Sequence, residues 1–324
     1  MGDPLARLDE VVDWEVFAAV LDGIPRVEAK GPGGRPAYEP MLLFKVLVIQ
    51  SLYNLSDAQI EFQITDRLSF KRFLGFSAAD KAPDEKTVWA FREKLTRSGL
   101  VGGLFKAFHA ELGRKGLFAR KGQMVDATFV EVPRQRNSRE ENAAIREGRT
   151  PEGWEETPEM LRQKDLEARW TKKNEVSHYG YKNHVKVDSK SKLIEAFVVT
   201  DAAVHDSQAL EALLEVGDPK TYTDSAYAGK VCEAVFAAKQ VEGKVIERAY
   251  RNKQLTARQK KRNRAKSKIR VRVEHVFATM KMSMRRAWNR CVGRARNEAA
   301  IAMTNLVYNM VRFEQIERLG LRSW

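Results

Sequence analysis

The first third of the chain has apolar residues at helical spacing. After Pro40, the stretch MLLFKVLVIQSLYNL is apolar on nearly all sides, which predicts a buried helix. Ser56 precedes a second stretch, in which Ile60 and Ile64 begin a helical stripe. Asp84 follows a break and is a candidate N-cap for the next helix. Residues 1–118 are therefore predicted to form short helices with sharp turns, which suits either a helix-turn-helix unit or a plain helical bundle.

The pattern changes near residue 119 to short strands alternating with helices. The segment KGQMVDATFVEVP is rich in Val, Thr and Phe and ends at Pro133, as expected of a strand. The segments SHYGYKNHVKVDS and LIEAFVVTD follow as two more strands and suggest a hairpin. Helices and strands then alternate to the end of the chain. Residues 119–324 are predicted to be a mixed α/β domain, with a polar insert at 134–175 and C-terminal helices over 274–318.

Positive charge is concentrated in one internal segment, residues 251–273. It carries eleven Lys and Arg and no acid, so it accounts for +11 of the net charge of +14. Such a run is often only a solvated face or tail. This run, however, leads directly into an apolar helical pattern, which favours a surface that contacts nucleic-acid phosphates.

Composition and missing motifs narrow the function classes. Two cysteines exclude a disulfide framework or a cysteine-rich zinc site. The sequence has no GxxxxGK[ST], GxGxxG after a strand, GxSxG or HExxH motif. The longest apolar run, Met41 to Ile49, is interrupted by Lys45 and is too short to span a bilayer. We expect a cytoplasmic protein with a polyanionic partner and no membrane association.

Three carboxylates stand at positions suited to catalysis. Asp126 lies inside an apolar strand, where a charge is costly unless it is paired or bound to metal. Asp224 ends the strand TYTDSAY, 98 positions later, and Glu274 follows after 50 more, at the start of an apolar helix face. Oxygen ligands suit Mg²⁺ or Mn²⁺, and two such ions can promote phosphodiester displacement. Alternatively, Asp126 could be a strand residue that is salt-bridged or faces solvent, and Asp224 could simply end its strand as a turn former.

Around these acids the chain resembles the DDE transposases of bacterial insertion sequences, most closely the insertion sequence 5 family. The blocks GQMVDATFVEVPRQRN, YTDSAYAG and RVRVEHVFATMK carry the likeness. The wider family signature is Tyr-x2-Arg-x3-Glu-x6-Lys. Arg270, Glu274 and Lys281 have the required spacing, whereas position 267 is Ser instead of Tyr. The resemblance extends over about residues 35–310.

The resemblance implies a ribonuclease H-like mixed sheet flanked by helices, behind an all-α N-terminal domain for DNA binding or dimerisation. It implies that Asp126, Asp224 and Glu274 are catalytic and bind two Mg²⁺ or Mn²⁺ ions. The enzyme would bind the terminal inverted repeats of its own element, cut there, and join the 3′-hydroxyl ends to target DNA. Its partner would be double-stranded DNA at the nucleoid, and synapsis of two ends implies a homodimer or larger assembly.

Basic residues near Glu274 are the predicted DNA contacts. Arg270, Glu274 and Lys281 fall on roughly one face of an α-helix, so two cations would flank the carboxylate where DNA passes. Pairing of Arg270 with Glu274 is the alternative, and it contributes little stability. The predicted set of DNA-binding residues is Arg270, Lys281, Arg272, Lys268, Lys266, Arg264, Arg262, Lys261 and Lys260.

Three other functions share some of these features. A ribonuclease H-like nuclease that cuts without joining would use the same acids. A DNA-binding regulator that has lost catalysis would not need all three. A cationic packaging protein would bind any nucleic acid in a salt-sensitive way.

Overall fold

The computed structural model describes residues 2–25, 37–250 and 253–322. Residues 251 and 252, which open the predicted basic segment, lie outside these ranges. The chain divides into two compact units. One contains the residues up to Leu117 together with those from Ala302 onward, and the other contains Phe118–Ile301. No helix in the described ranges is long and apolar enough to cross a membrane.

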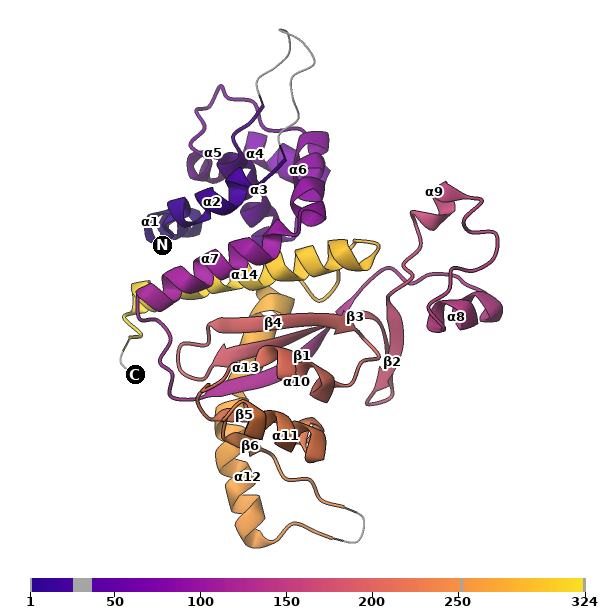
Figure 1. Cartoon of the computed structure of the whole chain (residues 1–324). Helices are drawn as coiled ribbons and strands as arrows, with labels where there is room; N and C mark the ends of the chain where they lie inside the picture. Colours follow the sequence, from indigo (N-terminus) through magenta and orange to yellow (C-terminus); the bar gives the residue numbers. More distant parts are fainter. Residues whose placement is uncertain (1, 26–36, 251–252, 323–324) are drawn as a thin grey trace. The chain divides into compact units, whose positions relative to one another are not determined.

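Helices build the first unit, as the apolar spacing predicts (Figure 1). Two of them begin as expected: Ser56 forms a capping box with Gln59, and the Asp84 side chain accepts a hydrogen bond from the Thr87 backbone N–H at 2.7 Å. The α-helices are α1 (Pro4–Val11), α2 (Ala18–Asp22), α3 (Pro40–Tyr53), α4 (Asp57–Asp66), α5 (Leu68–Phe73), α6 (Glu85–Arg97) and α7 (Leu100–Arg114), with the 3₁₀ turn η1 (Trp14–Phe17) before α2.

Aromatic side chains fill the core of this unit. The rings of Phe17 and Phe44 have centroids 4.8 Å apart, and the Phe17 and Phe108 rings stack at 5.9 Å. All three side chains are buried. Helix α3 supplies Phe44 and much of the remaining core, which explains why its sequence is apolar on nearly all sides.

The last helix, α14 (Arg294–Leu319), belongs to both units. We expected residues 274–318 to form the C-terminal helices of the catalytic domain, but the residues from Ala302 onward group with the N-terminal helices. Phe313 packs edge-on against Phe108 at 6.3 Å, and Glu314 forms an ion pair with Arg7 at 2.9 Å. Tertiary packing therefore assigns this half of the helix to the first unit.

A six-stranded mixed sheet is the centre of the second unit. Strand β1 (Gln123–Glu131) pairs antiparallel with β3 (Val176–Asp188), which pairs antiparallel with β4 (Ile194–Asp201) and β2 (Arg169–Lys173). On its other edge β1 runs parallel to β5 (Thr221–Thr223), which runs parallel to β6 (Gly243–Val245). The expected hairpin is therefore β3–β4. This mixed order is consistent with a ribonuclease H-like fold.

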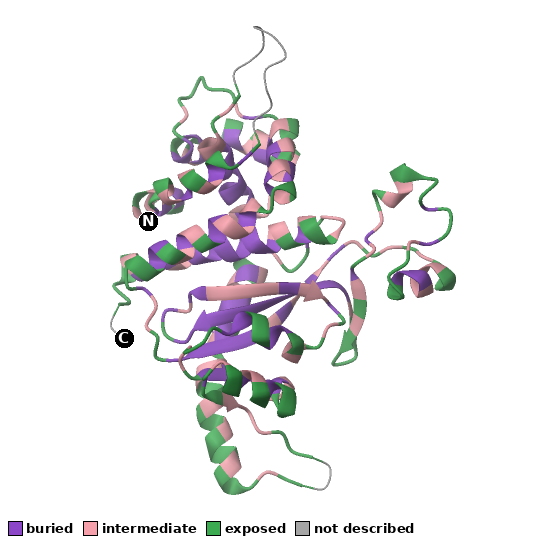
Figure 2. Ribbon diagram, in the orientation of Figure 1, coloured by how far each residue is buried: buried purple, intermediate pink, exposed green. Residues whose placement is uncertain are grey.

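Apolar residues cover both faces of this sheet, and strands β1, β3 and β5 are largely buried (Figure 2). On one face, Val125 lies in a buried cluster with Leu210 of α10 (Leu210–Leu213) and Phe236 of α11 (Lys230–Ala238). Val130, on the opposite face by strand alternation, lies in a second cluster with Tyr181 and Ile301. Two-sided burial explains why the strand sequences are so rich in Val and Ile.

The predicted insert at 134–175 contains α8 (Arg139–Arg146), α9 (Pro158–Leu161) and, at its end, β2. Asp165 anchors it. This buried carboxylate accepts hydrogen bonds from the Tyr181 hydroxyl at 2.8 Å and from the Gly293 backbone N–H at 2.9 Å. The insert is thereby fixed to β3 and to the segment that precedes α14.

The basic run forms a helix, α12 (Ala257–Arg270), which is followed by α13 (Arg272–Ala278) and the π-helical turn η4 (Thr279–Ser283). Val271 separates α12 from α13, and η4 ends at Ser283. In Figure 1, α13 lies behind the sheet, on the side away from α10. Two 3₁₀ turns, η2 (Asp206–Ala209) and η3 (Ser225–Tyr227), complete the unit.

Candidate active site

Asp126 lies on β1 just beyond the last residue that pairs with β5. Pairing with β5 covers only Gln123 and Met124, so this edge of β1 is open from there until Glu131, which forms a bridge with Trp288. The Asp126 side chain is nearly buried, with 7% of the residue exposed. Its Oδ1 accepts a hydrogen bond from the Ala127 backbone N–H at 2.8 Å, and its Oδ2 contacts Arg270 Nη1 at 2.5 Å.

Asp224 follows β5 directly and caps η3. Its Oδ1 accepts a hydrogen bond from the Ala226 backbone N–H at 2.9 Å, as expected of a residue that ends a strand and starts a turn. Because β5 runs parallel to β1, the carboxyl end of β5 brings Asp224 beside the Asp126 edge. Capping a turn and lining a site are therefore combined in one residue.

Glu274 lies in the first turn of α13, and Arg270 is the last residue of α12. Arg270 Nη2 approaches Glu274 Oε1 at 3.5 Å, so this guanidinium lies between two of the three predicted acids. The Glu274 side chain is 54% exposed, in contrast to Asp126. Arg270 therefore pairs with Glu274, as the alternative to DNA contact predicted, but its contact with Asp126 is shorter.

One cavity of about 740 Å³ brings these residues together. Asp126, Asp224 and Glu274 line it, as do Arg270 and Lys281. The other lining residues come from β1, the β2–β3 hairpin, α13 and η4: Ala127, Thr128, Phe129, Lys173, Asn174, Val176, His178, Phe277, Ala278 and Met282. Three acids far apart in sequence therefore share one concave surface with two of the predicted cations.

The charge on Asp126 is only partly compensated. The pKa of this carboxyl is raised to about 6, mainly by burial and in smaller part by the neighbouring Asp224 and Glu274, despite the lowering effects of Arg270 and the Ala127 N–H. At neutral pH the ionised form is thus held in an environment that disfavours it. A cation in addition to Arg270 would relieve this cost.

The side chains that line this cavity suit a divalent metal, although the three carboxylates do not converge on one coordination site. Among the described residues, no group of three or more His, Cys, Asp or Glu side chains is close enough to hold a metal ion. The donor set is nevertheless three carboxylates, the hard oxygen ligands that Mg²⁺ and Mn²⁺ prefer. The uncompensated charge on Asp126 points the same way. Asp126, Asp224 and Glu274 are the residues that could hold such an ion.

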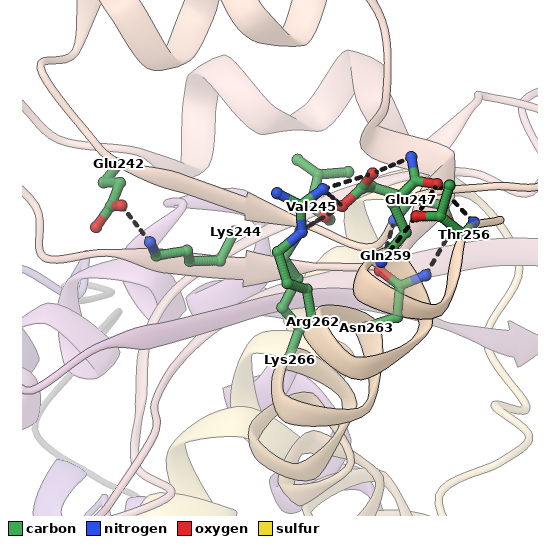
Figure 3. A network of polar contacts seen from close by, with 9 residues as sticks. All are labelled: Glu242, Lys244, Val245, Glu247, Thr256, Gln259, Arg262, Asn263 and Lys266. Atoms are coloured by element: carbon green, nitrogen blue, oxygen red, sulfur yellow. Dashed lines mark hydrogen bonds and ion pairs between the residues drawn. The ribbon is translucent and has the colours of Figure 1, made fainter.

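The other predicted DNA contacts lie on and after α12, and they divide into two sides. Figure 3 shows the inner side, where Arg262 and Lys266 approach Glu247 at 3.0 and 3.8 Å and the Lys266 ammonium donates to the Val245 carbonyl at 2.6 Å. Asn263 holds the Glu247 backbone in the same network. These contacts fix the helix against the end of β6.

The outer side of α12 carries Lys260, Lys261, Arg264 and Lys268, all exposed. No hydrogen bond or ion pair joins these four to the rest of the described chain. Figure 2 shows the helix mostly in the colour of exposed residues, and none of its residues is buried. Arg272 differs from both groups, because its Nη1 donates to the Ser189 carbonyl at 2.8 Å.

Several residues that line the cavity were not predicted from the sequence as site residues. Phe129 and His178 stack with ring centroids 4.2 Å apart, and Lys173 lies beside them on the β2–β3 hairpin. Phe129 could have been found as a neighbour of Asp126 on the same strand. Lys173 and His178 lie near the end of the insert, and only the pairing of β2, β3 and β1 brings them to the cavity.

Comparison with known families agrees with this geometry. Residues 118–310 match the family model described as "Transposase DDE domain", and residues 1–94 match that described as "Transposase domain (DUF772)". The first match alone covers more than half of the chain and includes Asp126, Asp224 and Glu274. No solved structure was found to match. On the strength of these two matches, the chain belongs to the DDE transposases.

Proposed function

We propose that this chain is the transposase of a bacterial insertion sequence, of the insertion sequence 5 type, and that Asp126, Asp224 and Glu274 are its catalytic acids. The observation that carries the proposal is the cavity that all three acids line together with Arg270 and Lys281. Residues of a nuclease site need to converge in this way, whereas three unrelated structural acids do not.

In this proposal Asp126, Asp224 and Glu274 would hold two Mg²⁺ or Mn²⁺ ions, which would supply activation of the attacking hydroxyl and stabilisation of charge on the leaving oxygen. Water attacks the phosphorus at the element end, the P–O3′ bond breaks, and a 3′-hydroxyl is freed. That 3′-hydroxyl then attacks a phosphorus of the target strand and displaces the target 3′-oxygen. Arg270 and Lys281 bind the phosphate oxygens and orient the strand.

The rest of the chain supplies DNA binding and assembly. We infer that residues 1–118 recognise the terminal inverted repeats or mediate dimerisation, and that α12 contacts the DNA backbone near the cavity. Two element ends have to be brought together, so the working form is a homodimer or larger, acting on the bacterial nucleoid. The N-terminal match to a transposase domain supports this division of roles.

The test is cleavage of labelled duplex DNA that carries the sequences flanking the gene, with Mg²⁺ present. The purified protein should nick at fixed positions and form end-joined products. Asp126→Asn, Asp224→Asn and Glu274→Gln should each slow cleavage by about a hundredfold or more. Asp201→Asn is the matched control, because Asp201 ends β4 and caps the Ala203 N–H at 2.8 Å without lining the cavity.

Each outcome has a distinct meaning. Nicking without joined products would favour a nuclease of the same fold. DNA binding without cleavage by the wild-type protein, with Mg²⁺ and also with Mn²⁺, would contradict the enzyme assignment. Normal cleavage by the three variants would move the catalytic site elsewhere.

A further inference from the structure

The cavity lining includes a second, basic group of side chains that the catalytic acids do not explain. The β2–β3 hairpin supplies Lys173 and His178 to its lining, and η4 supplies Lys281. The three predicted catalytic acids come instead from β1, the end of β5 and α13. One concave surface therefore carries carboxylates from one set of elements and cations from another.

Ring contacts hold the position of Lys173. Its ammonium lies 5.8 Å from the centroid of the Phe129 ring. Phe129 stacks on His178 with an angle of 10° between the rings, and the His178 Nδ1 is 2.8 Å from Glu131 Oε1. Glu131 thus orients His178, and the His178 ring stacks on Phe129. The Phe129 ring in turn contacts the Lys173 ammonium.

Lys173 and its neighbour Lys172 have different surroundings, as expected of consecutive residues in a strand. Lys172 is paired with Glu175, its ammonium 2.6 Å from the carboxylate, and it does not line the cavity. Lys173 lines the cavity and has no carboxylate within ion-pair distance in the described parts of the chain. Only one of these two adjacent lysines therefore has charge available for a ligand.

The positive charges of Lys173 and Lys281 also repel each other. Burial lowers the pKa of Lys281, and the charge of Lys173 lowers it further, against the raising effects of Glu274 and Glu131. Lys281, like Lys173, forms no ion pair within the described residues. Two lysines that repel each other in one cavity suit an anionic ligand with oxygens for both.

We propose that Lys173, together with Lys281, binds a backbone phosphate of the DNA strand next to the phosphate that is cut. The β2–β3 hairpin is then one wall of the DNA-binding cavity. This inference rests on the proposed function, since it assumes that a DNA strand passes the three acids. A DNA strand bound in this cavity would present a neighbouring phosphate to the two lysines.

The experiment measures binding and cleavage separately. Fluorescence anisotropy with the same flanking-sequence duplex, at several salt concentrations and without divalent metal, gives the slope of log affinity against log salt. Lys173→Ala should weaken binding several-fold and reduce the magnitude of this slope by about 0.9, the effect of losing one phosphate contact. It should also slow cleavage when Mg²⁺ is added. Lys173→Arg should restore both.

Lys172→Ala is the matched control and should bind and cut as the wild type does. An unchanged melting temperature for Lys173→Ala would show that the exposed lysine does not support the fold. A salt slope and cleavage rate equal to those of the wild type would overturn the inference. If the wild type bound the duplex but did not cut it, the proposed function would fail, while a reduced slope for Lys173→Ala would still support the phosphate site.

Discussion

The fold compensates the charge of Asp126 only in part, and Arg270 is its only ion-pair partner in the described parts of the chain. The guanidinium contacts the same carboxylate that would bind a metal ion. A cation that occupies this site has to displace or share that contact. If the proposed function holds, Arg270 competes with the metal for Asp126 before DNA arrives and binds phosphate afterwards.

Arg270→Gln should therefore tighten binding of Mn²⁺ to the metal-free protein, by about tenfold, equivalent to about 1.4 kcal/mol. Isothermal titration calorimetry at pH 8, where Asp126 is ionised, measures this directly. Arg262→Gln is the control with the same charge change, since Arg262 pairs with Glu247. Weaker Mn²⁺ binding by Arg270→Gln would mean that the arginine helps to hold the site together.

Glu195, on β4, gives a pH prediction away from the cavity. The pKa of its carboxyl is raised to about 7, mainly by burial and in smaller part by Asp188 and Asp218, despite the lowering effects of Lys186 and the Gln123 side chain. Its Oε2 accepts a hydrogen bond from Gln123 Nε2 at 2.8 Å, whereas its Oε1 is buried with no partner in the described chain. The ionised form is therefore costly.

Because the folded-state pKa lies above the unfolded value, the folded protein binds more protons between these two values, and stability falls as pH rises through this window. The free energy of unfolding should decline from about pH 4.5 to pH 7. Glu195→Gln should reduce this decline to the part that Asp126 contributes, and be more stable by up to about 3 kcal/mol above pH 7. Urea unfolding at a series of pH values measures it. A Glu211→Gln control, at an exposed position on α10, should behave as the wild type.

Helix α12 shows what an element adds to its residues. Arg262 and Lys266 are four residues apart and face Glu247 and Val245, whereas Lys260, Arg264 and Lys268 repeat at the same interval on the exposed side. In the sequence all of them belong to one basic run. In the helix, one side contacts the rest of the fold and the other side is exposed and available to DNA.

Two double variants of equal charge change test this division. Lys260→Gln with Arg264→Gln should reduce the magnitude of the salt slope of DNA binding by roughly 1.8 and leave the melting temperature unchanged. Arg262→Gln with Lys266→Gln should lower the melting temperature and largely keep the slope. Fluorescence anisotropy and thermal denaturation give the two readouts. Equal loss of DNA affinity in both variants would contradict the assignment.

At the scale of the whole molecule, α14 links the two units through one continuous helix, and its last part belongs to the N-terminal core. Phe313→Ala should lower the free energy of unfolding of the first unit by about 3–5 kcal/mol, because it leaves a cavity beside Phe108. Hydrogen exchange should speed up in α3 and α7. Strands β1 and β3, which lie in the other unit, should keep their protection; faster exchange there would mean that the units unfold together.

Much of the fold could be predicted from the sequence because local patterns report local structure. The apolar spacing of α3, the caps at Ser56 and Asp84, and the hairpin β3–β4 were all evident from their own segments. The break between α12 and α13 at Val271 was not, because the residues around it suit a continuous helix. The sequence also did not predict that the last half of α14 groups with the N-terminal helices, since this grouping depends on partners such as Phe108.

The sequence by itself determined which residues are available for chemistry: three acids, an arginine and a lysine at family spacing, and a basic helix. Only the tertiary structure decided which of them meet. Parallel pairing of β1 with β5 brings Asp224 beside Asp126, and the position of α13 adds Glu274. The hairpin adds Lys173 to the same cavity. Strand pairing and helix packing join residues far apart in the chain, so no local pattern can predict that convergence.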